Sequence, residues 1–412
     1  MAGKLSGTAI EAGTISLAKL DANLNSAVGV LKVSSIVYPS GSSVNINGND
    51  VIELVGSGFN SNANVYINYT LVSNITVTNS SSISVTTPAQ NVGTYLLQVS
   101  NPDGASITVT PGIEYAEVIE FQGTVSGYTS GGKLPPFSGL NTIDKFPFAS
   151  DGNATDVGDL TQGRFNPAGQ SSTESGYTSG GLIPAYQNNI DKFPFASDAN
   201  ATDVGDLTSG RYGVAGQSSS TSGYSSGGAT PTYVDVIDKF PFASDGNATD
   251  VGDLTVARNR PAGQSSTDNG YTSGGTSPVS PTTKNQIDKF PFASDANATD
   301  VGDLTQARYS PAGQSSTDNG YSSGGYTPTT RNIIDKFPFA SDANATDVGD
   351  LTQSRSSPAG QSSSNNGYSS GGGSPPTTNS NIIDKFAFAS NANATDVGDL
   401  TQGRYGAAGQ QV

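Results

Sequence analysis

Apolar residues near the N-terminus recur at spacings of three and four. Leu17, Leu20, Leu24, Val28 and Leu31 would therefore share one face of an α-helix. A helix of about two heptads is marginal alone in water, so its apolar stripe needs a partner surface. We predict that residues 1–32 form a short N-terminal helix that serves as an attachment and oligomerisation segment, with a homotrimer favoured. The alternative is a helix that packs on its own domain.

Residues 33–116 follow a different pattern, in which apolar and polar residues alternate over short runs. Such runs occupy residues 51–55, 82–85 and 95–99, and glycine-rich or Asn-Pro-Asp-Gly turns follow at 56–58 and 101–104. Alternation with a period of two is typical of strands that bury one face. Strands at this rhythm over about 80 to 100 residues predict a two-sheet, immunoglobulin-like sandwich.

From residue 117 to residue 412 the sequence repeats one unit six times. Each unit holds four strand candidates: Ala-Gly-Gln-Ser-Ser, Gly-Tyr-x-Ser-Gly-Gly, Ile-Asp-Lys-Phe-x-Phe and Val-Gly-Asp-Leu-Thr. The repeated tyrosines lie 47 to 50 residues apart, at Tyr128, Tyr177, Tyr224, Tyr271, Tyr321 and Tyr368. Four strands at this period are typical of one propeller blade, so we predict a six-bladed β-propeller. A triple-stranded β-helical fibre is the alternative architecture.

Two segments, one at each end of the repeat region, are candidates for the first strand of the first blade. Residues 118–121 form an apolar run before the first Gly-Tyr, and Ala408-Gly409-Gln410 follows the sixth repeated arginine. Because only the second of these matches the repeat, we predict that the C-terminal strand completes the first blade. This arrangement would close the ring and remove exposed sheet edges.

The composition supports a folded all-β protein and excludes several kinds of chemistry. The chain has 51 glycines, 13% charged residues, 17 tyrosines and 16 phenylalanines, and it has no cysteine and no histidine. Disulfides, Ser-His and Cys-His nucleophile pairs, and the usual zinc, copper and haem ligand sets are therefore excluded. A net charge of −16 repels nucleic acid and anionic lipid, so neither is an expected partner. We expect no cofactor.

Carboxylates are the remaining source of chemistry. An acidic turn recurs in each repeat, as at residues 198–206, and its oxygens could hold calcium or could hydrogen-bond their own backbone. Its Asn-Ala-Thr triplets are interpreted as turn residues rather than glycosylation sites. Paired carboxylates could also cleave glycosidic bonds. Almost every aspartate belongs to the sixfold pattern, with Asp235 as the odd one, and glutamate is nearly absent from the repeats apart from Glu174. We therefore predict no catalytic residue, no metal ligand and no enzymatic activity.

The stretches between Gly-Gly and Ile-Asp-Lys-Phe vary in length and composition between the repeats. In a propeller they would all emerge on one face, and loops on a rigid scaffold commonly carry recognition. Aromatic rings with a few charges suit saccharide or protein surfaces. The candidate ligand-binding residues are Lys133, Phe137, Tyr186, Tyr233, Lys284, Tyr326 and Arg331. The alternative is that these loops have drifted without function.

Two segments resemble known domain families, and a third resembles an attachment segment. The turns and strands at 39–41, 54–59, 87–95 and 101–104 resemble the TIG (IPT) family of immunoglobulin-like domains, which implies a spacer or interaction module. The double glycine, the aromatic strand and the arginine before each next unit resemble Kelch repeats, although Leu160 stands where that family has tryptophan. Residues 7–21 resemble N-terminal attachment segments of phage tail-fibre proteins.

These features together predict a structural protein of a virus particle, a tail or capsid fibre. It would be assembled in the host cytoplasm and would display its repeat head for host-surface recognition. Its expected partners are other virion proteins and a host surface glycan or protein. The N-terminus lacks the pattern of a signal peptide, so neither export nor membrane insertion is expected. The alternatives are a purely structural decoration, a bacterial surface adhesin and a glycan-cleaving tailspike.

Overall fold

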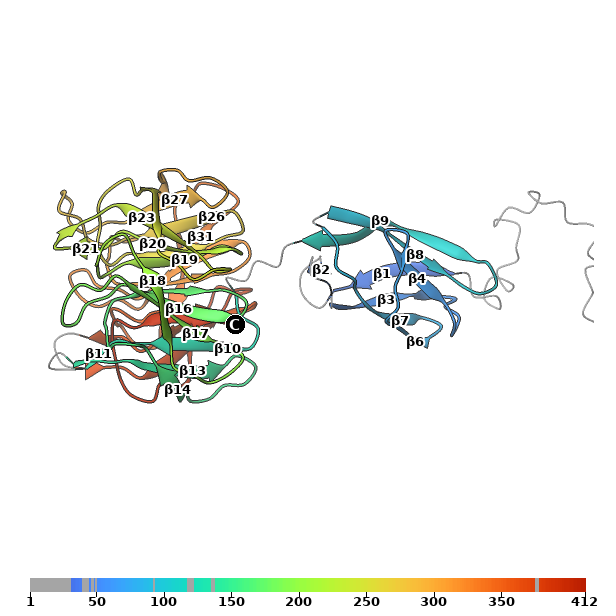
Figure 1. The fold of residues 1–412 in the computed structure, drawn as a ribbon, viewed down its shortest axis with the longest axis horizontal. Helices are drawn as coiled ribbons and strands as arrows, with labels where there is room; N and C mark the ends of the chain where they lie inside the picture. Colours follow the sequence, from blue (N-terminus) through green and yellow to red (C-terminus); the bar gives the residue numbers. More distant parts are fainter. Residues whose placement is uncertain are drawn as a thin grey trace, which may run out of the picture. The chain divides into compact units, whose positions relative to one another are not determined.

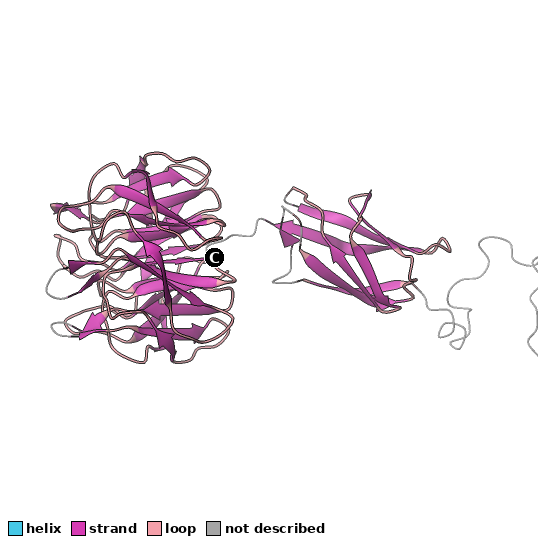
Figure 2. Cartoon of the chain, turned by 60° about the horizontal axis from the view of Figure 1, so that its bottom comes forward, coloured by secondary structure: helices cyan, strands magenta, loops and turns pink. Residues whose placement is uncertain are grey.

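The computed structural model describes residues 31–38, 44–45, 48, 50–91, 93–116, 122–134, 138–374 and 378–412. The regular structure in these ranges is entirely β-strand (Figure 2), as the composition predicts. No helix long and apolar enough to cross a membrane occurs in them. The chain divides into two units, Met1–Val118 and Ile119–Val412.

The first unit is built from two β-sheets. One sheet has the order β1 (Lys32–Val37), β3 (Val51–Ser57), β7 (Ser82–Thr86) and β6 (Ile75–Asn79). The other has the order β2 (Val44–Asn45), β9 (Ser106–Ala116), β8 (Gly93–Ser100), β4 (Asn64–Ile67) and β5 (Thr70–Leu71).

The core of the first unit follows from the alternation in its strands. Ile52 and Leu54 on β3 are fully buried, while Val51 and Glu53 are exposed and Val55 is half-buried. They pair with Val85 and Ile83 on β7, which are also fully buried. The predicted N-terminal helix lies almost wholly outside the described residues. Its last position, Leu31, is described, and it packs against this core.

The second unit contains six four-stranded antiparallel sheets, numbered here in chain order. Sheet 1 consists of β39 (Ala408–Gln411), β10 (Ser126–Ser130), β13 (Thr142–Pro147) and β14 (Thr155–Asp159), the last three side by side in Figure 1. Sheet 2 consists of β15 (Ala168–Ser171), β16 (Ser175–Ser179), β17 (Asn189–Pro194) and β18 (Thr202–Asp206). Sheet 3 consists of β19 (Ala215–Ser218), β20 (Ser222–Ser226), β23 (Val236–Pro241) and β24 (Thr249–Asp253).

The other three sheets repeat this pattern. Sheet 4 consists of β25 (Ala262–Ser265), β26 (Asn269–Ser273), β27 (Gln286–Pro291) and β28 (Thr299–Asp303). Sheet 5 consists of β29 (Ala312–Ser315), β30 (Asn319–Ser323), β31 (Ile333–Pro338) and β32 (Thr346–Asp350). Sheet 6 consists of β33 (Ala359–Ser362), β34 (Asn366–Ser370), β37 (Ile382–Ala387) and β38 (Thr395–Asp399).

Three of the variable stretches carry a short hairpin of their own. These are β11 (Lys133–Leu134) with β12 (Ser138–Gly139), β21 (Ala229–Thr230) with β22 (Thr232–Tyr233), and β35 (Gly373–Ser374) with β36 (Thr378–Asn379). The six sheets described above contain the four strands predicted for each repeat, and the β-helical alternative does not match this arrangement.

The six sheets form a closed ring. Their first strands contact one another in the cyclic order β15, β19, β25, β29, β33 and β39, and β39 in turn contacts β15. The C-terminal strand β39 pairs with β10 of the first repeat, as the sequence predicts, with Gly127 opposite Gln411 and Ser130 opposite Ala408. Sheet 1 is thus made from both ends of the repeat region, which leaves no gap in the ring.

Each junction between sheets buries a small aromatic core. In one of them Tyr177, Ile190 and Leu207 of sheet 2 meet Phe240 and Phe242 of sheet 3. Ile190 and Phe193 are three residues apart on β17, so they point to opposite faces of the strand. Ile190 joins the junction with sheet 3, whereas Phe193 joins the junction with sheet 1. The Ile-Asp-Lys-Phe motif therefore serves two junctions at once.

At the centre of the ring the backbones approach too closely for any side chain. A Cβ added to Gly409 would lie 2.0 Å from the carbonyl oxygen of Gly360 in the neighbouring sheet. The glycine of every Ala-Gly-Gln motif is in the same position: Gly169, Gly216, Gly263, Gly313, Gly360 and Gly409. The neighbouring glutamines bind across the junctions, because Gln410 donates from Nε2 to Ser130 Oγ and to the carbonyl of Tyr177, both at 2.9 Å.

Candidate functional site

The connections between strands leave the ring at two opposite ends. Successive connections of an antiparallel meander alternate between ends, so the connection from second to third strand shares an end with the one to the next sheet. In sheet 2 these are residues 180–188 and 207–214. Bridges such as Phe165 with Leu182 and Tyr212 with Ala229 join them across junctions. This end, which carries the variable stretches, is termed the loop face, and the other end is termed the turn face.

The chain enters the ring at the turn face. Gln122 donates from Nε2 to the carbonyl of Ser315, and the backbone N–H of Gly123 donates to the carbonyl of Ser362. Ser315 and Ser362 end the innermost strands β29 and β33, where those strands reach the turn face. The loop face is therefore at the opposite end of the second unit from the segment that enters it.

The mouth of the central channel on the loop face is closed by backbone. Six residues form a cycle in which each N–H donates to the carbonyl of the preceding member, at 2.7 to 2.9 Å. They are Asn166, Gly213, Arg260, Ser310, Ser357 and Gly406, all with positive φ. A cavity of about 110 Å³ is lined by these residues and by the three-residue segments that follow them, each of which ends in Ala-Gly. A ligand at the mouth would thus rest on a rigid polar floor.

Aromatic side chains lie next to one part of this mouth. The ring of Tyr186 stacks on that of Tyr212, with centroids 5.8 Å apart and planes at 20°. Phe165 lies 6.3 Å from Tyr212, and the guanidinium carbon of Arg260 lies 5.7 Å from the centre of the Tyr212 ring. Tyr186 is 40% exposed, so the outer face of this stack reaches solvent.

A second aromatic pair lies beyond Arg260. The rings of Tyr309 and Tyr326 have centroids 5.3 Å apart. Burial raises the pKa of Tyr309, the positive charge of Arg260 lowers it, and Tyr326 and Tyr233 raise it further. Tyr309 directly precedes Ser310, whose N–H donates to the carbonyl of Arg260 at 2.8 Å, and Tyr212 directly precedes Gly213, whose carbonyl accepts from the N–H of Arg260. The two aromatic pairs therefore lie on either side of Arg260 along the mouth cycle and form a cluster of tyrosines next to it.

Two of the candidate ligand-binding residues, Lys133 and Lys284, are buried rather than exposed on the loop face. Lys133 is 7% exposed, and its ammonium nitrogen lies 4.2 Å from the centre of the Phe165 ring and 5.0 Å from that of Tyr405. Lys284 is 6% exposed. A cation held between two rings gains cation–π stabilisation, which explains how Lys133 is accommodated. Phe137 lies outside the described residues.

The other candidates lie at the surface of the loop face. Tyr186 is exposed, and Tyr233, Tyr326 and Arg331 are half-buried. Arg331 donates from Nη2 to the carbonyl of Thr327 and so braces its own loop. Tyr186 and Tyr326 belong to the two aromatic pairs, which the ring brings to one face from different repeats.

Sequence reasoning missed the residues that complete this cluster. They directly follow the repeated arginine, a position that varies between repeats: Phe165, Tyr212, Asn259, Tyr309, Ser356 and Tyr405. The signal that could have found them is variation at a fixed place in an otherwise constant segment.

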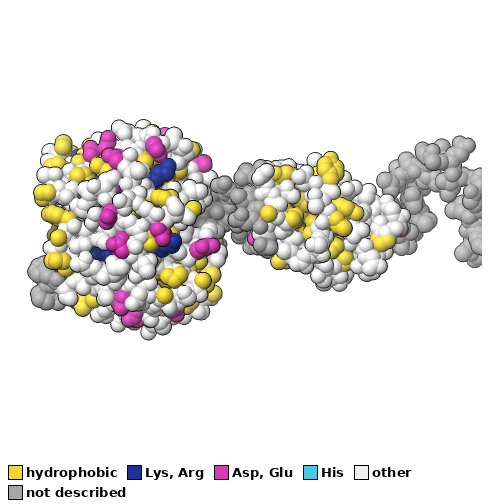
Figure 3. All heavy atoms as spheres, in the orientation of Figure 1, with side chains coloured by type: hydrophobic (Ala, Val, Ile, Leu, Met, Phe, Trp, Pro, Cys, Tyr) yellow, Lys and Arg dark blue, Asp and Glu magenta, His cyan; other side chains and the backbone are white. Residues whose placement is uncertain are grey.

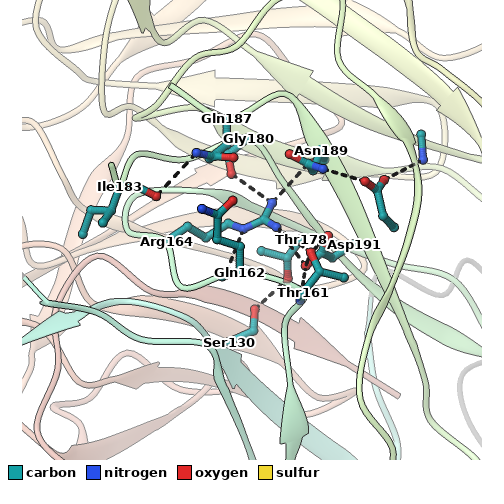
Figure 4. A network of polar contacts seen from close by, with 12 residues as sticks. Ser130, Thr161, Gln162, Arg164, Thr178, Gly180, Ile183, Gln187, Asn189 and Asp191 are labelled. Atoms are coloured by element: carbon teal, nitrogen blue, oxygen red, sulfur yellow. Dashed lines mark hydrogen bonds and ion pairs between the residues drawn. The ribbon is translucent and has the colours of Figure 1, made fainter. Parts of the chain in front are cut away.

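The repeated arginines themselves are structural. Arg164 donates from Nη2 to Oδ2 of Asp191 in sheet 2 at 2.8 Å, and both side chains are fully buried (Figure 4). Its Nη1 donates to the carbonyl of Asn189, and Thr161 donates its hydroxyl proton to the same aspartate. Buried charges of this kind need a partner and satisfied hydrogen bonds. The carboxylate of each Ile-Asp-Lys-Phe motif is therefore bonded to an arginine of the preceding sheet.

The acidic turns are also engaged in local bonds. Asp198 pairs with Lys145 at 3.1 Å, and Asp203 Oδ1 accepts a hydrogen bond from the N–H of Gly205. Burial alone would lower the pKa of Lys145, but its hydrogen bond to Asp198 raises the pKa overall. Within the described ranges, no group of three or more acidic side chains is arranged to hold a metal. In Figure 3 the visible acidic side chains of the second unit form small separate groups on a mostly uncharged surface.

Comparison with known proteins identifies one domain. Residues 31–114 match the IPT/TIG domain family, and this segment is a TIG/IPT immunoglobulin-like domain, as its turns and strands predicted. The two-sheet arrangement of the first unit agrees with this assignment. No curated protein matches the chain.

Proposed function

We propose that this chain is a non-enzymatic structural protein of a virus particle that infects bacteria, a component of a tail or capsid fibre. Its ring of six sheets would act as a recognition head for a host surface glycan or protein. Other virion proteins and further copies of the chain would be its assembly partners. One observation carries this proposal. The chain enters the ring at the turn face, and the variable aromatic loops lie at the opposite end, on the loop face.

The ring is best interpreted as a Kelch-like β-propeller. Four-stranded repeats, closure by a terminal strand, the double glycine and an arginine at each junction all favour this interpretation. Gly131 and Gly132, with φ of +69° and +100°, form a turn that requires glycine. Leu160, in place of the Kelch tryptophan, is buried in the core between sheets 1 and 2.

Binding is favoured over catalysis because of how the charges are used. The repeated aspartates and arginines form buried pairs, and most repeated lysines pair with the acidic turns. The loop face instead presents tyrosine rings, which suit saccharide or protein surfaces. Several heads in one particle would add weak contacts through a high effective concentration.

The binding of labelled full chain to a panel of bacterial strains tests this proposal. We expect a subset of strains to bind the chain, and Tyr186→Ser on the loop face to weaken binding severalfold. Thr173→Ala on the turn face is the control and should bind as the unmodified chain does. The proposal fails if no strain binds, or if the turn-face change weakens binding and the loop-face change does not.

A further inference from the structure

We infer that the mouth of the central channel holds a subsite for an acidic saccharide, with Arg260 receiving the carboxylate and Tyr186 and Tyr212 receiving the sugar face. This inference rests on the proposed recognition role and names the chemical class of its ligand. It is carried by the surroundings of Arg260, by its neighbour Asn259 and by the exposed tyrosine stack.

Arg260 differs from the repeated arginines in its partners. Each repeated arginine pairs with a buried aspartate of the next sheet, whereas no carboxylate lies within ion-pair distance of Arg260 in the described part of the chain. Its Nε is buried and has no hydrogen-bond partner among the described residues, as is also true of five of the six repeated arginines, so the missing carboxylate is what sets Arg260 apart. An arginine fork suits a planar carboxylate, because two parallel N–H groups can bind its two oxygens.

Asn259 supplies a second unsatisfied polar atom at the same place. It is 3% exposed, and its Oδ1 has no hydrogen-bond partner among the residues that the structure describes. This oxygen lies against Gly213 of the mouth cycle. Four of the six equivalent positions hold an aromatic ring, so this acceptor is particular to the third repeat. A buried acceptor without a partner is costly, and a hydroxyl group of a ligand would satisfy it.

The tyrosines provide the apolar part of the subsite. Tyr186 and Tyr212 are stacked, and Arg260 lies over the ring of Tyr212 at 5.7 Å. A flat, partly exposed aromatic surface beside a cation matches a pyranose ring that carries a carboxylate, since the C–H face of the sugar packs on the ring. The net charge of −16 disfavours densely charged polyanions such as nucleic acid. A saccharide with isolated carboxylates fits both conditions.

Arg260→Asn is the matched variant for testing the subsite. Asn166 occupies the equivalent place in the mouth cycle with a φ of +52°, close to the +56° of Arg260, so asparagine keeps the backbone of this turn. Lys145→Met, which removes a cation outside the loop face, from the exposed pair with Asp198, is the control. The melting temperature of each variant confirms that the ring is intact.

The experiment is calorimetric titration of the full chain with oligogalacturonides, alginate oligomers and sialylated oligosaccharides, each as the free acid and as its methyl ester. We expect at least one free acid to bind, its ester to bind at least tenfold more weakly, and Arg260→Asn to lose the difference while Lys145→Met keeps it. The inference is overturned if no free acid binds, if ester and acid bind equally, or if Arg260→Asn binds as the unmodified chain does.

The same variant separates this inference from the proposed recognition role. If strains bind the unmodified chain and Arg260→Asn equally well, the acidic subsite is wrong and recognition by the loop face stands. If no strain binds the unmodified chain, the recognition role itself fails.

Discussion

Arg404 and Asp144 form a fully buried ion pair of 2.8 Å that joins sheet 6 to sheet 1, although the two residues are 260 positions apart in the chain. The same pair joins every other junction, where the partners are only 27 to 30 positions apart: Arg164 with Asp191, Arg211 with Asp238, Arg258 with Asp288, Arg308 with Asp335, and Arg355 with Asp384. Ring closure thus uses the same chemistry as the internal junctions.

Removing one partner of this pair should destabilise the ring strongly. Arg404→Met leaves Asp144 as a buried charge without its cation, which costs about 3 to 5 kcal/mol. Denaturant unfolding should show that loss in the free energy of unfolding. Lys145→Met, which breaks the exposed pair with Asp198, should cost at most about 1 kcal/mol. Equal losses in the two variants would contradict the structural role assigned to the buried pair.

Substitution of a central glycine should lower the melting temperature, whereas substitution of an exposed glycine should not. Gly409→Ala would put a methyl group 2.0 Å from the carbonyl oxygen of Gly360, so the innermost strands must separate. Overpacking of this kind costs about 1 to 3 kcal/mol or more. Gly152→Ala is the control, because its Cβ would meet nothing within 4 Å. Thermal unfolding should show a lower melting temperature for Gly409→Ala alone, and equal melting temperatures would argue against close approach at the ring centre.

Alkaline pH should destabilise both units through their buried tyrosines. Burial raises the pKa of Tyr115 and of Tyr271 to about 12, and it raises the pKa of the tyrosines at the other five junctions. The unfolded chain loses these protons near pH 10, so stability is unaffected below pH 10 and falls between pH 10 and about 12. Tyr115 and Tyr271 each contribute up to about 1.4 kcal/mol per pH unit in that interval.

Two measurements at high pH check this expectation. Absorbance at alkaline pH should show the junction tyrosines ionising only well above pH 10, and the melting temperature should fall steeply above pH 10. A single titration step near pH 10 for all tyrosines, without loss of stability, would contradict the burial of these rings.

Asp235 predicts a charge effect that is particular to the third repeat. The other five repeats have asparagine at this position: Asn141, Asn188, Asn285, Asn332 and Asn381. Burial raises the pKa of Asp253, and the negative charges of Asp235 and Asp250 raise it further. The folded state therefore binds this proton more tightly than the unfolded state. Stability falls as pH rises from the unfolded pKa, about 3.9, through the folded one.

Asp235→Asn should relieve part of this penalty. We expect the free energy of unfolding at pH 7 to rise by up to about 1 kcal/mol, as for other partly exposed charges, and to change little at pH 3. Asn285→Asp, the reciprocal change in the fourth repeat, should do the opposite at pH 7. An equal effect at both pH values would show that charge is not the cause.

Much of the fold could be predicted because the strands of each repeat are visible in its own sequence pattern. The glycine, tyrosine and phenylalanine positions of one unit recur six times, and the extra Ala408-Gly409-Gln410 indicated how the ring closes. The alternation around Ile52 and Leu54 likewise predicted the sandwich of the first unit. Local periodicity carries this information because side chains alternate across a strand.

The candidate site was less predictable because it is assembled across junctions. Lys133 lies in the first variable stretch by sequence, yet the ring brings it between Phe165 and Tyr405, which buries it. Arg260 lies two residues after a repeated arginine, at a position that varies between the repeats, but its sequence does not show that it lacks an acidic partner. Contacts between neighbouring sheets decide both outcomes, and those contacts exist only once the ring has closed.

The measurement that tests the central claim most directly is electron cryomicroscopy of the full chain in its native particle. We predict that the six-sheet rings project from the particle with the loop face, marked by Tyr186 and Arg260, directed outward and free of neighbouring subunits. Loop faces buried against neighbouring subunits would contradict the recognition role and make this protein part of the particle's architecture.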